Sequence, residues 1–210
     1  MNSLFLGLFV IAGILHLASC LKDWELLRQV TKPILIPLLI GYYLTNAITP
    51  QPIIAGALLF GFAGDVLLLS SKRSWFIAGL LAFLGGHFLY ITTLVVDLNR
   101  LDYHILLPVF FLYGLIGVLA FVYLRESLGA LKIPVITYLI VLEAMSLIAL
   151  HRLWFNPNQA TALVFIGTLL FCLSDFLLSQ RFFVKAGRHP HFNVMLTYLT
   201  AQCLIVYGLR

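Results

Sequence analysis

Three side chains that can exchange protons lie inside apolar stretches of this 210-residue sequence. Asp65 lies in ALLFGFAGDVLLL, His87 in FIAGLLAFLGGHFLY, and Asp175 in LLFCLSDFLL. Each stretch is apolar enough for a lipid bilayer, where an ionisable side chain is costly unless it meets a partner, water or a substrate. Two carboxyl groups and an imidazole in such positions favour acid–base chemistry within a membrane.

The composition indicates that these side chains belong to a membrane protein. Hydrophobic residues make up 62% of the chain and charged residues only 10%, whereas soluble domains carry about 25% charged residues. The net charge is +5, but the basic residues lie in short segments between apolar runs, with no basic tract that alternates with aromatics. This pattern predicts contact with membrane lipids and argues against a nucleic-acid partner.

Apolar runs long enough to cross a bilayer recur along the whole chain. A span needs about 20 mostly apolar residues, and on that scale the sequence predicts an all-α bundle of eight transmembrane helices. Pro33 suits the first turn of the second helix, where a missing N–H costs little. No linker is long enough to divide the bundle, so residues 1–210 are expected to form a single integral membrane domain. The expected spans are 3–21, 33–49, 52–70, 75–96, 104–124, 132–151, 159–179 and 193–209.

Basic residues are distributed unevenly between the two sides of the predicted bundle. Ten of the 13 Lys and Arg residues follow odd-numbered spans, among them Arg28, Lys32, Lys72 and Arg181. Cytoplasmic loops of membrane proteins carry the excess of Lys and Arg, so both termini are expected on the non-cytoplasmic side. We therefore expect a multi-pass protein of the cell (inner) membrane.

The segments around the two aspartates resemble each other. LLFGFAGDVLLLSSKR contains Asp65 and LLFCLSDFLLSQRF contains Asp175, with a one-residue gap between the two patterns. The third and seventh spans run in the same direction, which is consistent with a parallel repeat of four spans each. Both aspartates lie within about two turns of the cytoplasmic ends of their helices, so we expect them to face each other at one depth.

Further polar side chains lie at membrane depth in the predicted spans. Tyr90 follows His87 by three residues and shares its helix face, and Gly85 and Gly86 permit the close approach of a helix or a ligand. The remaining four are Tyr138, Glu143, Tyr198 and Gln202. Such residues are often interhelical contacts only, so none of them indicates a reaction when taken alone.

The sequence contains no recognisable ligand set for a metal ion. It has no HExxH motif and no Cys/His spacing typical of zinc sites. Its cysteines, Cys20, Cys172 and Cys203, lie in or beside apolar segments and are expected to be buried thiols. We therefore expect activity without a metal or another cofactor.

Several short motifs, taken in order, resemble those of one family of membrane proteins. The chain is similar to the lysoplasmalogenase family, the YhhN-like proteins that include the eukaryotic transmembrane protein 86 enzymes. The matching motifs are Lys32-Pro33, Gly64-Asp65, the segment FIAGLLAFLGGHFLY with its His-x-x-Tyr ending, Ser174-Asp175 followed by Arg181-Phe182, and the residues from Tyr198 to Gln202. Their order and spacing over 32–202 carry the resemblance.

This resemblance implies an eight-helix hydrolase that cleaves the vinyl ether bond of a lysoplasmalogen. The implied products are a fatty aldehyde and glycerophosphoethanolamine or glycerophosphocholine. The family's two intramembrane aspartates correspond to Asp65 and Asp175, which with His87 are the expected catalytic residues. The expected substrate-binding residues are Lys32, Tyr90, Tyr138, Glu143, Tyr198 and Gln202.

Vinyl ether cleavage needs a protonated carboxyl group as acid and a carboxylate that stabilises an oxocarbenium ion and activates water. Two carboxyl groups that share an apolar site ionise unequally, so the aspartate pair suits both tasks, and the sequence leaves open which one is the acid. Two other functions also stay open. Intramembrane acids and a histidine suit a proton-coupled transporter, and a metal-dependent hydrolase of the ceramidase type would need more histidine ligands at one depth.

Overall fold

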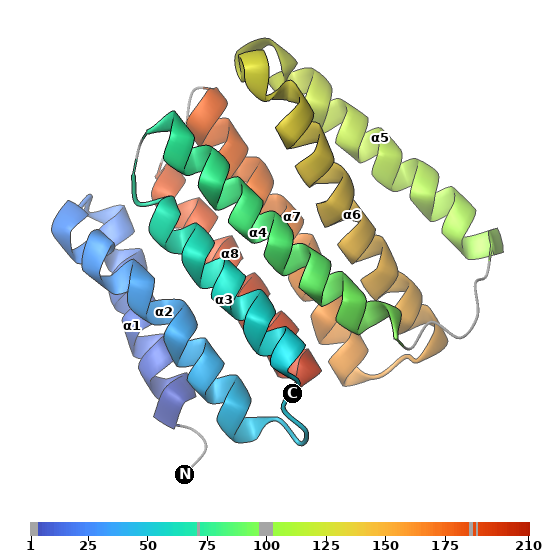
Figure 1. The fold of residues 1–210 in the computed structure, drawn as a ribbon, viewed down its shortest axis with the longest axis horizontal. Coiled ribbons are helices and arrows are strands. Elements are labelled where there is room, and N and C mark those ends of the chain that lie inside the picture. Colours follow the sequence, from blue (N-terminus) through green and yellow to red (C-terminus); the bar gives the residue numbers. More distant parts are fainter. Residues whose placement is uncertain (1–3, 71, 97–102, 185–186, 188) are drawn as a thin grey trace.

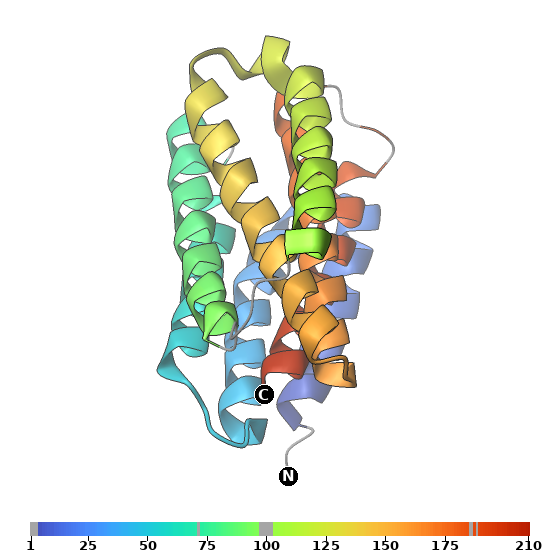
Figure 2. The same ribbon diagram turned by 90° about the vertical axis from the view of Figure 1, so that its right-hand side faces the viewer.

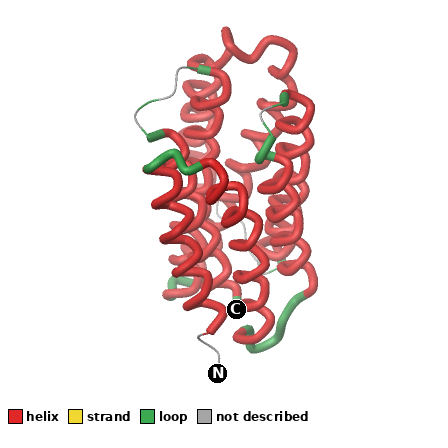
Figure 3. Tube along the Cα trace, turned by 90° about the vertical axis from the view of Figure 1, so that its left-hand side faces the viewer, coloured by secondary structure: helices red, strands yellow, loops and turns green. Residues whose placement is uncertain are grey.

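The computed structural model describes residues 4–70, 72–96, 103–184, 187 and 189–210. These residues form eight α-helices and one short 3-10 helix, with no strand among them (Figures 1 and 3). The predicted all-α class is therefore confirmed. The helices are α1 (Leu4–Leu21), α2 (Glu25–Asn46), α3 (Pro52–Leu67), α4 (Arg73–Val95), α5 (Tyr103–Leu128), η1 (Gly129–Leu131), α6 (Lys132–Phe155), α7 (Gln159–Phe183) and α8 (Pro190–Leu209).

Seven of the helices form a closed circuit, and the eighth lies outside it. Neighbouring helices touch in the order α1, α2, α3, α4, α6, α7 and α8, and α8 returns to α1. In the described residues, the close backbone contacts of helix α5 are with α6, α7 and η1, and Figure 2 shows it on the outside of the bundle. Both termini lie at one end of the bundle (Figure 1). Successive helices alternate in direction, so α3 and α7 both run away from that end. Their C-terminal parts, which carry Asp65 and Asp175, therefore lie at the opposite end of the bundle.

The apolar surface is that of a multi-pass membrane protein. Five stretches of the described residues are long and apolar enough to cross a membrane: α1, α4, the stretch 106–155 that includes α5 and α6, α7, and α8. Helix α3 is apolar but shorter. Large apolar side chains of α5 such as Phe110, Phe111 and Leu115 are exposed, as expected for a face in contact with lipid. Eight crossings and the repeat of four spans each stay predictions.

The main correction to the predicted boundaries concerns α2. This helix begins at Glu25, eight residues before the expected start at 33, so Pro33 lies inside the helix with Pro37 and does not open it. Arg28 and Lys32, expected in a loop, are therefore helical. The polar residues in the first two turns of α2 continue the helix because they face a polar cavity. The acidic side chain of Glu25 also suits the first turn, where the helix dipole favours a negative charge. Every other boundary between described residues lies within four residues of its predicted position.

Glycines bring two helix pairs into close contact, and these pairs carry the aspartates. The most extensive contacts in the bundle are those of α7 with α8 and of α3 with α4. A Cβ on Gly86 would lie 3.0 Å from the carbonyl oxygen of Ala57, and one on Gly167 would lie 3.0 Å from the carbonyl oxygen of Ala201. Because backbone atoms cannot move aside, only glycine permits these approaches.

Candidate functional site

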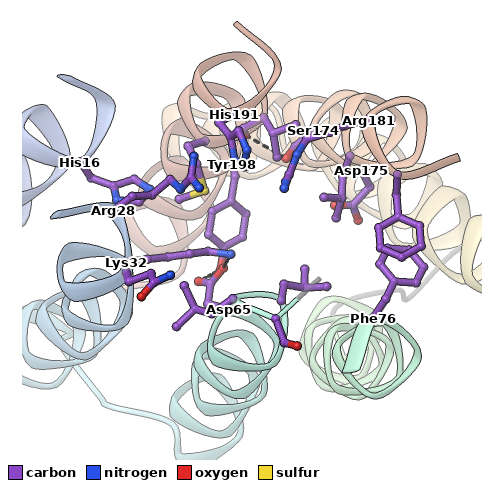
Figure 4. Close-up of a pocket in the computed structure, with 18 of the residues that line it drawn as sticks. His16, Arg28, Lys32, Asp65, Phe76, Ser174, Asp175, Arg181, His191 and Tyr198 are labelled. Carbon is purple, nitrogen blue, oxygen red and sulfur yellow. Dashed lines mark hydrogen bonds and ion pairs between the residues drawn. The ribbon is translucent and has the colours of Figure 1, made fainter. Parts of the chain in front are cut away.

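Asp65 and Asp175 both line one cavity of about 230 Å³. The cavity lies at the end of the bundle where α2 and α8 begin and α3 and α7 end, and Figure 4 shows the side chains that surround it. Helices α3 and α7 are not backbone neighbours in the described residues, so the two aspartates reach the cavity from separate helix pairs, α3 with α4 and α7 with α8. Its lining is polar on one side, and on the other it includes apolar side chains such as Leu68, Phe76 and Phe83.

Asp65 is held by one cation and one hydroxyl. The residue is 2% exposed, its Oδ1 lies 3.2 Å from Nζ of Lys32 on α2, and its Oδ2 accepts a 2.8 Å hydrogen bond from the Tyr198 hydroxyl on α8. Gly61, one turn earlier on α3, lies close to the polar side chains of α8, since a Cβ there would lie 3.3 Å from Nε2 of Gln202 and 3.6 Å from the Tyr198 hydroxyl oxygen. Asp65 is thus oriented by two helices that approach from different directions.

Asp175 is held by a different set of groups. It is 8% exposed, and its Oδ2 accepts a hydrogen bond from the Tyr138 hydroxyl on α6. Nε2 of His87 on α4 lies 2.9 Å from the same hydroxyl oxygen and 3.8 Å from Oδ2 of Asp175. Because the Tyr138 hydroxyl donates its hydrogen bond to Asp175, its oxygen accepts the hydrogen bond from Nε2–H of His87. This pattern assigns a proton to Nε2 of the imidazole. Nδ1 of His87 has no hydrogen-bond partner among the described residues.

The other predicted substrate-binding residues divide into two groups. Tyr90 and Gln202 line no part of the cavity and join α4 to α8 through a 3.0 Å hydrogen bond between the Tyr90 hydroxyl and Oε1 of Gln202. Glu143 does not join the aspartates either. Its carboxylate lies against Gly117 of α5, which is outside the circuit of seven helices. The neighbouring Leu142 faces the core, so Glu143 lies on another face of α6. Lys32 and Tyr198 line the cavity, and Tyr138 lines a small apolar cleft beside Asp175.

The structure adds polar cavity residues that were not among the predicted site residues. They are His16, Glu25, Arg28, Gln29, Arg181 and His191. The spacing of Glu25, Arg28, Gln29 and Lys32 at i, i+3, i+4 and i+7 is that of one helix face, and this pattern was the signal available in the sequence. The described residues contain no group of three or more His, Cys, Asp and Glu side chains arranged to hold a metal ion.

Comparisons with known proteins agree with this architecture. The chain is 30% identical over 153 residues to the human protein "Lysoplasmalogenase TMEM86B". The match covers 73% of this chain and 61% of the human protein, so the chain spans less than two thirds of that relative's length. No solved structure matches the chain. The model of the YhhN family matches residues 27–209, which include both aspartates and the side chains that contact them, and the chain therefore belongs to the YhhN family.

Proposed function

We propose that this protein is a membrane hydrolase that cleaves the vinyl ether bond of a lysoplasmalogen. The products would be a fatty aldehyde and glycerophosphoethanolamine or glycerophosphocholine. The observation that carries the proposal is the placement of two buried carboxyl groups, from two separate helix pairs, in one cavity. The name of the human relative, a lysoplasmalogenase, supports the same reaction.

The two aspartates have environments that suit different roles. Asp65 forms an ion pair with Lys32, and it is the carboxylate that stabilises positive charge and accepts a proton from water. Asp175 has no lysine or arginine partner among the described residues; it accepts a hydrogen bond from the Tyr138 hydroxyl and lies 3.8 Å from Nε2 of His87. Asp175 is therefore the proton donor in the proposed mechanism.

The reaction returns both carboxyl groups to their starting states. Asp175 protonates the carbon β to the ether oxygen, which leaves an oxocarbenium ion. Water adds to that ion while Asp65 takes its proton, and a hemiacetal forms. Asp65 then protonates the departing glycerol oxygen, and the Asp175 carboxylate takes the hydroxyl proton of the hemiacetal as the aldehyde forms.

A small cleft of about 10 Å³ lies beside Asp175, with room for about one water-sized group. It is lined by Leu68, Phe76, Leu80, Phe83 and Leu178 together with Tyr138, Asp175 and Ser179. The apolar side chains Leu68, Phe76, Phe83 and Leu178 also line the larger cavity, where they are the surface available to the alkenyl chain of this substrate.

One observation favours a second candidate, a proton-coupled transporter. His87, Tyr138 and Asp175 form a continuous hydrogen-bonded path from the interior of the bundle to the cavity, as proton relays require. Such a protein would depend on the same aspartates for transport and would release no aldehyde.

The test measures aldehyde release from an alkenyl lysophospholipid by purified, monodisperse protein in detergent. Asp65→Asn and Asp175→Asn are each expected to lower turnover by about 10²-fold or more, the usual worth of a positioned acid or base. The double variant is expected to be little worse, because groups that act together are not additive.

Asp23→Asn is the matched control, since Asp23 is exposed and its positive φ of 51° is tolerated by asparagine. Near-normal turnover in both single variants would contradict the mechanism, and the absence of aldehyde release from the unaltered protein would favour the transporter. Loss of activity in EDTA, restored by one metal, would instead favour the metal-dependent hydrolase.

A further inference from the structure

Two arginines at the mouth of the cavity form no ion pair with a carboxylate among the residues that the structure describes. Arg28 of α2 and Arg181 of α7 are both half-buried and line the cavity that contains the aspartates (Figure 4). Lys32, on the same face of α2 as Arg28, forms an ion pair with Asp65. Lys32 is thus neutralised, whereas neither guanidinium group is paired in this way within the described part of the chain.

Basic side chains from three helices line this cavity: Arg28 and Lys32 on α2, Arg181 on α7 and His191 on α8. The exposed carboxylate of Glu25, one turn before Arg28 on α2, also lines it. Like charges that are partly shielded from water raise the free energy of the folded protein unless an anion lies between them. Arginine pairs of this kind bind phosphate oxygens through two parallel N–H bonds each.

We propose that Arg28 and Arg181 form the site that binds the phosphate group of the lysophospholipid. The inference rests on the proposed function, because it assigns one end of the same cavity to the headgroup of the proposed lipid substrate. The same arginines would bind the phosphate of a soluble phosphate ester, so the experiment must distinguish a lipid headgroup from a soluble phosphate ester.

The order of groups along the cavity matches the order of groups in the lipid. Arg181 follows Asp175 by six residues, which is about 9 Å along α7 at about 1.5 Å per residue. In the lipid, the glycerol backbone separates the vinyl ether oxygen from the phosphate. Glu25 precedes Arg28 by one turn on the same face of α2 and also lines the cavity, so its carboxylate lies where the amine of the headgroup would extend.

The test compares the binding of three probes to purified protein in detergent. The first is a saturated 1-O-alkyl lysophosphatidylethanolamine, which has no vinyl ether to cleave, and the second is a 1-O-alkylglycerol with the same chain and no phosphate. The third is glycerophosphoethanolamine, which has the headgroup and no chain. Arg28→Gln and Arg181→Gln are each expected to weaken binding of the first probe by about tenfold and to leave the second unchanged.

Control variants separate recognition from folding. Arg125→Gln removes an exposed arginine of α5 at the same end of the bundle and is expected to leave all three probes unaffected. Arg28→Lys and Arg181→Lys are expected to retain part of the binding of the first probe, because they keep the charge and lose the paired N–H bonds. Equal losses for the first two probes, or no loss for either, would overturn the anion site.

The remaining outcomes identify the source of the phosphate and distinguish this proposal from the proposed function. Weak binding of glycerophosphoethanolamine assigns the site to a lipid headgroup, whereas binding as tight as that of the lysophospholipid assigns it to a soluble phosphate ester. If Asp65→Asn and Asp175→Asn keep normal turnover while the arginine variants still discriminate between the probes, the catalytic proposal fails and the anion site stands.

Discussion

At the scale of single residues, the Lys32–Asp65 ion pair is the feature that stability alone does not explain. The side chain of Lys32 is 12% exposed and that of Asp65 is 3% exposed, so both charges are largely removed from water. A buried ion pair generally contributes no more to stability than an apolar pair of the same size. Because this ion pair lines the same cavity as Asp175, it fits a role in chemistry better than a role in folding.

Removal of the cation alone is expected to leave a buried carboxylate without a partner. Lys32→Met should lower the free energy of unfolding by about 3 kcal/mol. The double variant Lys32→Met/Asp65→Asn should recover much of that loss, because the amide carries no charge. Thermal unfolding of the detergent-purified variants measures both changes, with exposed Lys72→Met as the control. A double variant no more stable than Lys32→Met would argue that the two residues do not form a pair.

At the scale of helices, the site depends on two closely packed pairs and on one unexpectedly long helix. The pairs α3–α4 and α7–α8 place Asp65, His87, Asp175 and Tyr198, and α2 carries its polar face along the cavity because it begins at Glu25. The α7–α8 pair contacts through Gly167, where an added Cβ would lie 3.0 Å from the carbonyl oxygen of Ala201 and 3.1 Å from the amide nitrogen of Ile205.

The close contact of α7 with α8 gives a prediction with an internal control. Gly167→Ala should destabilise the protein by about 2 kcal/mol, because the new methyl group meets backbone atoms that cannot move aside. Gly114→Ala on α5 adds the same methyl group where nothing lies within 4 Å, and it should leave stability unchanged or raise it by up to about 1 kcal/mol. Equal thermal stability of the two variants would contradict the described packing.

At the scale of the whole molecule, the polar cavity and the apolar surface are segregated. The cavity opens at the end of the bundle away from the two termini, and α5 presents large apolar side chains on the outside of the circuit. Most of the basic residues belong to the cavity end, so the distribution of charge predicts that the cavity opens towards the cytoplasm.

This orientation is testable by labelling single cysteines in intact cells. In a background without Cys20, Cys172 and Cys203, a cysteine at Asn156 should react with a membrane-impermeant reagent, and a cysteine at Lys72 should react only after the membrane is opened. Two further positions predicted from the sequence, Asn99 on the outer side and Lys185 in the cytoplasm, lie outside the described residues. The opposite pattern at Asn156 and Lys72 would reverse the predicted topology and the side from which a lipid enters.

The sequence alone predicted the all-α class and most helix boundaries, and it indicated Asp65, His87 and Asp175 as candidate site residues. Apolar runs of bilayer length identify helices directly, because every backbone group in lipid must be satisfied within its own segment. Asp65, His87 and Asp175 stand out for a related reason, since an ionisable group in such a run is costly without a partner. The start of α2 was predicted wrongly because its first turns are polar, although their i, i+3, i+4, i+7 spacing is helical.

Only the tertiary structure decided which side chains meet. Most of these helices are apolar all round, so their sequences contain no periodic signal for the face that turns inward. Glu143 and Tyr138 lie on the same helix, yet Tyr138 contacts Asp175 and Glu143 lies against α5. Arg28 and Arg181 are far apart in the chain and share a cavity. The rotation of each helix about its axis is set by packing against neighbours that are distant in sequence, and no local pattern specifies it.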